Sequence, residues 1–233
     1  MHKTRGFTLI ELAVAMFILV LLLGSILVPL ATQVEQRQVS DTQRTLEEVK
    51  EALTGFAVVN GYLPCSDTDN DGLENVNAAT GFCSTVASNI SVGNLPWQTL
   101  GVASADVWGN RFRYVVHEQY ARRSPASTFT LNTTSPNVRA CASSTCGSIL
   151  ASSAVAAILS YGKNGYGATN SLSGAVNPAP TSADELENTN NDRTVVSRVQ
   201  TPVGTSAGEF DDIVTWLPVY ILFNRMITAG KLP

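Results

Sequence analysis

Residues 6–31 read GFTLIELAVAMFILVLLLGSILVPLA, and this stretch decides how the chain is organised. Its last 20 residues, 12–31, are apolar except for Gly24, Ser25 and Pro29. In a helix with a rise of about 1.5 Å per residue they extend roughly 30 Å, the thickness of the hydrocarbon core of a bilayer. The sequence therefore predicts a helix that spans a membrane.

The residues around this apolar segment restrict its interpretation. The leader MHKTRG, residues 1–6, contains Lys3 and Arg5. Positive charge favours the cytoplasmic side, so the chain after residue 31 is expected to be exported. A cleaved secretory signal peptide and a plain single-pass anchor are two alternatives. Neither explains Glu11, because a carboxylate beside an apolar span is unfavourable unless it is paired or functional.

The order of basic leader, Gly6, Phe7 and Glu11 resembles the prepilin signature of type IV pilins and type II secretion pseudopilins. The resemblance implies that a prepilin peptidase cuts after Gly6 and methylates Phe7, which leaves a mature chain of 227 residues (233 − 6). It also implies an α+β, pilin-like fold in which a long N-terminal helical spine packs on an antiparallel β-sheet. The implied partners are other pilin or pseudopilin subunits, the prepilin peptidase, the inner-membrane assembly platform and the lipid bilayer.

The position of Glu11 suggests a role in assembly. Removal of the leader exposes an α-amino group at Phe7, which lies one helical turn, roughly 6 Å, from Glu11. Between staggered subunits the amine of one chain would neutralise Glu11 of another in a low-dielectric environment, where a lone charge is strongly unfavourable. We therefore expect Glu11 to set the register of assembly.

The helical pattern continues beyond residue 31 in amphipathic form. One face repeats at intervals of four and three residues: Thr42, Leu46, Val49, Leu53 and Phe56. The Asn60-Gly61 pair and Pro64 then supply a stop signal. The pattern predicts one helix from residue 7 to about residue 59.

The rest of the chain has the composition of a loop-rich α+β domain, with Ser, Thr, Asn and Gly between short apolar runs. The predicted organisation is a leader (1–6), a transmembrane or filament-core helix (7–31), its amphipathic extension (32–60) and a periplasmic globular domain (61–233). Strands are expected at residues 111–120, 128–132, 155–161, 194–199 and 212–217. A closing helix is expected to begin near Pro218, and residues 162–192 are expected to form a surface excursion.

Four cysteines lie in the exported part: Cys65, Cys83, Cys141 and Cys146. An even number in an exported chain indicates disulfides, and pairing in sequence order is the simplest of the three possible patterns. A metal site is the alternative, although neither spacing matches the usual zinc patterns. In the loop-closure account the larger loop contributes about 3 kcal/mol and the smaller about 2 kcal/mol.

A possible calcium site is suggested by three alternating aspartates, Asp67, Asp69 and Asp71, followed by Gly72. This is how an EF-hand loop begins, because alternation lets three carboxylates converge on one hard cation. The twelfth position of the pattern is alanine here, so Glu74 would have to serve in a shortened loop. The alternative is a solvated turn inside the loop between the first two cysteines.

Two other acidic groups are expected to be structural or solvated. The group Glu209, Asp211 and Asp212 is expected at a strand edge or a helix entry, and the group Asp184, Glu185 and Glu187 in a solvated loop. The mature chain contains one histidine, His117, expected as a surface or partly buried side chain of a strand. No nucleophile elbow and no P-loop ending occur in the sequence, so an enzyme is not expected.

Taken together, the sequence favours a structural minor subunit of a type IV pilus or a type II secretion pseudopilus. Motifs such as GNLPW (93–97) and DVWGN (106–110) resemble those of a minor-pilin subgroup. The location that follows is the bacterial inner membrane, single-pass, with the C-terminal domain in the periplasm or, after assembly, on a cell-surface pilus. The alternative is a membrane-anchored periplasmic binding module that does not polymerise. The net charge of −4, with no basic stripe, does not favour nucleic acid as a partner.

Overall fold

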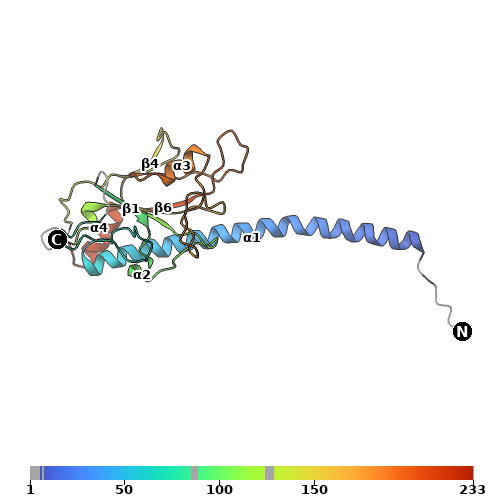
Figure 1. The fold of residues 1–233 in the computed structure, drawn as a ribbon, viewed down its shortest axis with the longest axis horizontal. Helices are drawn as coiled ribbons and strands as arrows, with labels where there is room; N and C mark the ends of the chain where they lie inside the picture. Colours follow the sequence, from blue (N-terminus) through green and yellow to red (C-terminus); the bar gives the residue numbers. More distant parts are fainter. Residues whose placement is uncertain (1–5, 7, 85–88, 124–128, 233) are drawn as a thin grey trace. The chain divides into compact units, whose positions relative to one another are not determined.

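The computed structural model describes residues 6, 8–84, 89–123 and 129–232, without the side chains of Leu23 and residues 25–30 (Figure 1). The chain divides into two compact units, Met1–Ser40 and Asp41–Pro233. The second unit contains all six strands and three of the helices, so the fold described below is that of this unit.

The first helix, α1 (Leu9–Asn60), confirms the single long helix expected from the sequence. It begins with a capping box, in which the carboxylate of Glu11 accepts hydrogen bonds from the backbone N–H and the hydroxyl of Thr8, both at 2.9 Å. In return the Thr8 Oγ1 atom accepts from the backbone N–H of Glu11 at 3.3 Å. The helix ends where Gly61 takes a left-handed conformation (φ 83°) and its N–H donates to the carbonyl of Ala57.

The apolar segment at the start of α1 is not confirmed as a membrane span. Among the residues that the structure describes, no helix combines the length and the sustained apolarity needed to cross a membrane.

The sheet has six strands: β1 (Ile90–Asn94), β2 (Arg113–His117), β3 (Val138–Cys141), β4 (Ile149–Ser160), β5 (Thr194–Val196) and β6 (Ile213–Pro218). Their order is β1-β2-β4-β3-β5, and β6 also pairs with β4. The expected α+β fold is confirmed, but the sheet is mixed, because β5 runs parallel to β3 while the other pairings are antiparallel. A parallel pairing needs a long connection, and the chain between β3 and β5 is long enough to include β4 and a helix.

The expected strands agree with the structure to different degrees. Strand β6 lies within one residue of its expected ends, and β5 begins at the expected residue 194 but already ends at Val196, whereas β4 begins six residues before the expected 155. The strand expected at 111–120 is shorter, because β2 ends at His117 and a 3-10 turn, η1 (Glu118–Tyr120), follows. No strand occurs in the described residues 129–132, where the chain forms a turn. Strands β1 and β3 are short and were not predicted.

Three further helices complete the second unit: α2 (Trp97–Leu100), α3 (Ala183–Thr189) and α4 (Val219–Thr228). The last of these begins directly after Pro218, as expected. Helix α3 lies within the segment 162–192, so this segment is not only a surface excursion. Ala168 of this segment is fully buried and belongs to the core of the domain.

The core has two parts. The amphipathic face of α1 is buried as the 3.6-residue period predicts, with Leu46, Val49 and Leu53 at most 1% exposed. A second cluster lies on one face of the sheet, where Val92 of β1, Val115 of β2 and Ala157 of β4 are register partners. Since side chains of register partners point to the same face, these three meet in one layer.

Candidate functional site

The N-terminal segment presents a large apolar surface. In the described part of residues 9–22 the large apolar side chains, from Leu9 at 89% to Ile18 at 50%, are at least half exposed. A helix that is apolar on all sides is stable only when lipid or other helices cover it. The expected processing site is only partly described: Gly6 is exposed, whereas Phe7 and residues 1–5 lie outside the described residues.

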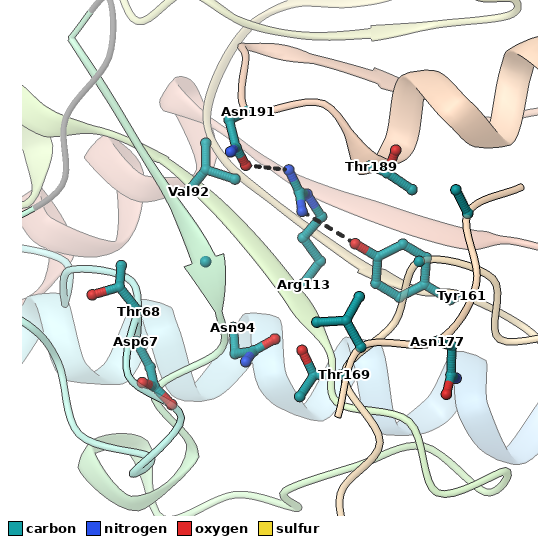
Figure 2. Close-up of a pocket in the computed structure, with 14 residues that line it drawn as sticks. Asp67, Thr68, Val92, Asn94, Arg113, Tyr161, Thr169, Asn177, Thr189 and Asn191 are labelled. Carbon is teal, nitrogen blue, oxygen red and sulfur yellow. Dashed lines mark hydrogen bonds between the residues drawn. The ribbon is translucent and has the colours of Figure 1, made fainter. Parts of the chain in front are cut away.

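A groove of about 600 Å³ opens on the second unit (Figure 2). Its floor is formed by Val92, Arg113 and Tyr161, and one wall by Asp67 and Thr68. The opposite wall comes from the segment 162–192: Gly167, Thr169, Val176, Asn177, Ala179, Thr189 and Asn191. This groove could not be predicted from the sequence, because its walls come from segments about 100 residues apart.

The three aspartates of the predicted calcium loop are brought together. One carboxylate oxygen from each of Asp67, Asp69 and Asp71 lies within 4.8 Å of the others. Asp67 is fully buried, and both of its oxygens already accept backbone hydrogen bonds, two from Asp69 and Asn70 and one from Gly72 at 2.9 Å. Burial raises the pKa of Asp67, although these hydrogen bonds act in the opposite direction.

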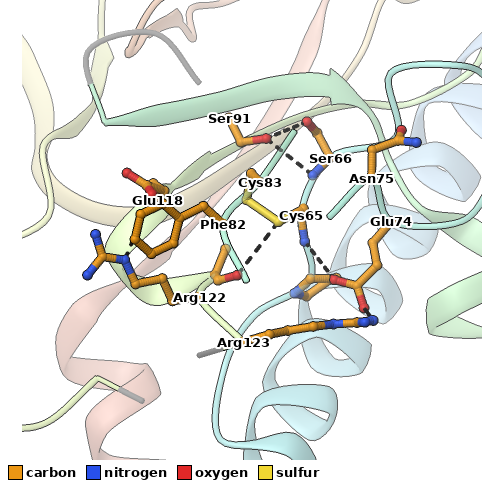
Figure 3. Close-up of a disulfide and its surroundings, with 12 residues drawn as sticks. Cys65, Ser66, Glu74, Asn75, Phe82, Cys83, Ser91, Glu118, Arg122 and Arg123 are labelled. Atoms are coloured by element: carbon orange, nitrogen blue, oxygen red, sulfur yellow. Dashed lines mark hydrogen bonds and ion pairs between the residues drawn. A yellow bond between two sulfur atoms is a disulfide. The ribbon is translucent and has the colours of Figure 1, made fainter. Parts of the chain in front are cut away.

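Glu74 does not join this group. One of its carboxylate oxygens accepts the backbone N–H of Cys65 at 3.1 Å, and the other forms an ion pair with Arg123 (Figure 3). The nearby disulfide joins Cys65 to Cys83, with 5.3 Å between the Cα atoms. Glu74 therefore belongs to the contacts around this disulfide.

The second disulfide joins Cys141 to Cys146, so the four cysteines pair in sequence order. It lies at the end of β3, where Cys141 is fully buried. Cys146 takes a left-handed backbone conformation with φ 55°, which is uncommon for a residue with a side chain.

The close contact between β1 and the aspartate loop depends on Gly93. The backbone N–H groups of Asp67 and Asn94 each donate to the carbonyl of the other, at 2.9 and 2.8 Å. A Cβ atom on Gly93 would lie 2.4 Å from the carbonyl oxygen of Asp67, a distance at which the backbone has to move.

We therefore expect Gly93→Ala to lower the free energy of unfolding by about 2–3 kcal/mol, because the clash is with backbone and not with a flexible side chain. Denaturant unfolding of both proteins measures the difference. Gly55→Ala is the matched control, since Gly55 lies within α1 and its added Cβ would meet nothing within 4 Å. That control is expected to stabilise by about 0.5–1 kcal/mol through helix propensity. Equal effects of the two changes would contradict the prediction.

The structure brings together a second group of carboxylates, and the solvated or surface positions expected for Glu185 and Asp212 are wrong. Glu185, Asp211 and Asp212, here called the buried carboxylate cluster, have oxygens within 4.8 Å of one another. Glu185 is only 2% exposed and Asp212 only 5%, so neither lies in a solvated loop or on a surface. The residues come from α3 and from the chain just before β6, and only the folded domain brings them together.

The buried carboxylate cluster has unused acceptors. Glu185 Oε1 accepts from the side chain of Asn164 and from the backbone N–H of Asp211, both at 3.1 Å. In contrast, Glu185 Oε2 and Asp211 Oδ1 are buried and have no hydrogen-bond partner among the described residues. Arg198 is the nearby cation, but its Nε atom pairs with Asp184 at 2.6 Å.

The charge on this cluster is costly in the absence of a cation. Burial raises the pKa of Asp211 to about 6 and raises the pKa values of Glu185 and Asp212 above their ordinary range. Neighbouring carboxylates add to each of these shifts. Three carboxylates with two unused oxygens are the donors that Ca²⁺ prefers. This cluster therefore fits a divalent cation better than the aspartate loop, in which the buried carboxylate is already saturated by backbone N–H groups.

His117 lies at the end of β2 and is buried, at 2% exposed. Its ring packs edge-on against that of Tyr120, with 5.7 Å between centroids. Burial lowers the pKa of His117, and its Nδ1 atom has no hydrogen-bond partner in the described part of the chain. The expectation of a surface or partly buried position is wrong, because the side chain is buried and its contacts are those of a core residue.

Comparison with known proteins identifies the N-terminal segment. The profile of the family described as "Prokaryotic N-terminal methylation motif" matches residues 1–27. No curated protein and no solved structure matches the chain significantly. The match includes Gly6, Phe7 and Glu11 and ends within the apolar stretch of α1. Residues 1–27 therefore carry the prepilin-type signature of type IV pilins and pseudopilins.

Proposed function

We propose that this chain is a minor subunit of a type IV pilus or of a type II secretion pseudopilus. The observation that carries the proposal is the methylation motif at residues 1–27, which runs directly into a helix with an exposed apolar surface. The motif points to a substrate of prepilin peptidase and to a structural subunit. The exported domain is larger than a compact repeating subunit requires, which favours a minor subunit.

In this proposal the chain passes through three states. It is inserted into the bacterial inner membrane through residues 7–31, with its C-terminal domain in the periplasm. Prepilin peptidase then cuts after Gly6 and methylates Phe7. The exposed apolar surface of residues 9–22 leaves the lipid and packs against the same surface of other subunits, so no apolar area is exposed to water at any stage.

Processing is tested by the mass of the mature chain. We expect a protein of 227 residues (233 − 6) that begins with methylated Phe7 when a prepilin peptidase is co-expressed. Gly6→Val is expected to abolish cleavage, because a branched side chain replaces the residue that the peptidase must accommodate. Gly24→Val is the matched control, since a Cβ atom there meets nothing within 4 Å, and it should be cleaved as the wild type is. A cleaved Gly6→Val chain, or a wild-type chain that keeps its leader, would contradict the proposal.

Assembly is a separate question, because an anchored binding module that does not polymerise would be processed in the same way. The groove of Figure 2 is the observation that favours this alternative. Cross-linking of cells followed by analysis of sheared surface filaments distinguishes the two. A minor subunit is expected in sheared filaments or in cross-linked products with a major subunit, whereas an isolated module is expected in neither.

We also propose that the exported domain binds a divalent cation, with calcium as the first candidate. The sequence favours Asp67, Asp69, Asp71 and Glu74 as ligands. The saturated oxygens of Asp67 and the ion pair of Glu74 weaken that choice. The unused oxygens of Glu185 and Asp211 support the buried carboxylate cluster instead. There a cation would neutralise charges that the fold holds away from water.

Thermal unfolding of the full chain in detergent tests this proposal. At a calcium concentration about 100 times the dissociation constant, binding to the folded state stabilises by about 2.7 kcal/mol, or about 5–10 °C in Tm for a domain of this size. Glu185→Gln with Asp211→Asn is expected to remove the calcium effect, and Asp69→Asn with Asp71→Asn is expected to keep it. The reverse result would assign calcium to the aspartate loop, and no effect on wild type would dismiss both sites.

The pH dependence without cation follows from the same cluster. Because burial raises the pKa of Asp211 to about 6, the folded chain binds more protons than the unfolded chain between about pH 4 and pH 6. Stability is therefore highest at the acidic end of this window and falls as the pH rises through about 6. In a chelator, Tm at pH 7.5 is expected to be about 5 °C below that at pH 5. This difference in Tm should be smaller when calcium is added, and smaller in the double variant Glu185→Gln, Asp211→Asn. If neither change reduces it, the pH dependence does not come from the buried carboxylate cluster.

A further inference from the structure

The groove of Figure 2 is lined by one cation, Arg113, which forms no ion pair with an acidic side chain of the described residues. Arg113 extends from β2 and donates to the hydroxyl of Tyr161 at 3.2 Å, to the backbone carbonyl of Asn190 and to the Oδ1 atom of Asn191 at 3.1 Å. All three acceptors are neutral. Within the described ranges, no carboxylate lies within 4 Å of its guanidinium nitrogens.

These contacts hold the guanidinium in place but do not use all of its N–H donors. A guanidinium has five N–H donors, and the three hydrogen bonds of Arg113 leave part of this set available. Because the side chain is already fixed by Tyr161 and Asn191, binding a ligand costs little further conformational entropy. The Nη2 atom uses both of its N–H groups on Asn190 and Asn191, so Nε–H and one Nη1–H remain, and each can donate one charge-assisted hydrogen bond to a carboxylate.

The only carboxylate in the groove wall does not compete for this position. Asp67 accepts backbone hydrogen bonds from Asp69, Asn70 and Gly72, which hold its carboxylate within its own loop. A negative group is therefore attracted by the guanidinium of Arg113 itself, and not by a net positive charge of the groove.

The other polar groups of the groove are mainly acceptors. Asn94 and Asn177 donate through their Nδ2 atoms to Asn70 Oδ1 and Gly165 O, which fixes the two amides. Their Oδ1 atoms accept no hydrogen bond in the part of the chain that is described. The hydroxyls of Thr68 and Thr189 likewise donate within the protein. Amide oxygens and hydroxyl lone pairs are thus available to a ligand that supplies several O–H donors.

A ligand with one carboxylate and several hydroxyls is an acidic sugar. The volume of about 600 Å³ lies within the range of small-ligand sites and suits one or two sugar units. Val92, Val176 and Ala179 provide a small aliphatic surface for the C–H groups of a sugar ring. A phosphate, in contrast, is usually held by more than one cation, and this groove contains a single arginine.

We infer that this groove binds a uronic-acid-containing saccharide, with its carboxylate on Arg113 and its hydroxyls on the fixed amide oxygens of Asn94 and Asn177. The inference goes beyond the proposed subunit role, because it does not require processing or assembly. It gives the exported domain an acidic polysaccharide as its ligand.

Calorimetric titration of the full chain, in a detergent without a sugar headgroup, tests the inference. The probes are digalacturonic acid and its neutral counterpart, digalactose, at low ionic strength. We expect the acidic disaccharide to bind at least about tenfold more tightly than the neutral one, since a charge-assisted contact is worth more than a neutral one. High salt should reduce this preference.

Three variants separate the groups involved. Arg113→Gln is expected to make the two disaccharides bind equally weakly, and Arg113→Lys to keep part of the preference, because lysine retains the positive charge without the planar set of donors. Asn177→Ala is expected to weaken both disaccharides by a similar factor, which leaves the preference intact. Arg44→Gln is the control for net charge, because the Arg44 side chain is 82% exposed and pairs only with Glu48 among the described residues.

Several results would overturn the inference. Equal binding of the two disaccharides to wild type would remove the role of Arg113, and so would a preference that survives Arg113→Gln. Tighter binding of a tripeptide with a free C-terminal carboxylate than of digalacturonic acid would assign the groove to peptides instead. Circular dichroism shows whether each variant is folded. If Arg113→Gln does not fold, Arg113→Lys still tests the role of the guanidinium and Asn177→Ala the role of the amide. If the wild-type chain binds neither disaccharide but is incorporated normally into filaments, this inference is rejected and the proposed function stands.

Discussion

Glu11→Gln is expected to reduce incorporation of the processed subunit into filaments by about 100-fold or more. In the proposed assembly the carboxylate of Glu11 pairs with the α-amino group of Phe7 of a neighbouring subunit, in surroundings made apolar by residues 9–22. Removing one partner of a buried ion pair costs about 3–5 kcal/mol, because the other charge stays buried and unpaired. The amount of subunit in sheared filaments, relative to the amount in the membrane, measures the effect.

The structure also gives Glu11 a second role, which this variant separates from the first. Its carboxylate caps α1 through Thr8, and glutamine can replace glutamate in a capping box. Glu11→Gln therefore removes the charge and keeps the cap. Thr8→Ala is the matched control, because it weakens the cap and keeps the charge, and we expect it to assemble nearly as well as wild type. If Thr8→Ala is lost from filaments and Glu11→Gln is not, the role of Glu11 is to cap the helix.

Removal of the Cys65–Cys83 disulfide by the double change to serine is expected to lower the free energy of unfolding by about 3 kcal/mol. The bridge closes a loop of 18 residues, and its loss frees that loop in the unfolded chain. For a domain of this size the loss corresponds to about 6–12 °C in Tm. The contacts between Glu74, Cys65 and Arg123 would loosen as well, since they lie beside the bridge (Figure 3).

The second disulfide provides the comparison. The Cys141–Cys146 bridge closes a loop of only 5 residues, for which the same account gives about 2 kcal/mol. Thermal and denaturant unfolding of both double variants should therefore rank the first as the more damaging. An equal or reversed order would show that native contacts at the bridges, and not loop closure, decide their contribution.

The features predicted correctly from the sequence are local and periodic. The prepilin-type signature around Gly6 and Phe7 is a short contiguous motif, so it can be read without knowing the fold. The first part of α1 follows from its continuous apolar run, its second part from a repeat of 3.6 residues and its end from the stop at Gly61, and the start of α4 follows from Pro218. Each of these signals depends on neighbours within about one helical turn, and tertiary contacts did not override them.

The errors concern residues whose neighbours are distant in the chain. Glu185 looks like a solvated residue in its own segment, but folding buries it and places it beside Asp211, 26 residues away. Glu74 lies in the right place for a calcium loop by spacing alone. Arg123, 49 residues further on, takes its carboxylate instead.

The same distinction between local and distant neighbours holds for the functional features of the chain. The processing site, the charge at Glu11 and the apolar surface of α1 follow from the order of residues, because a single helix displays its side chains in a fixed pattern whatever surrounds it. The buried carboxylate cluster and the groove around Arg113 exist only once the segment 162–192 has folded over the sheet. Burial and pairing of charge depend on which distant groups meet, and the tertiary structure alone decides that.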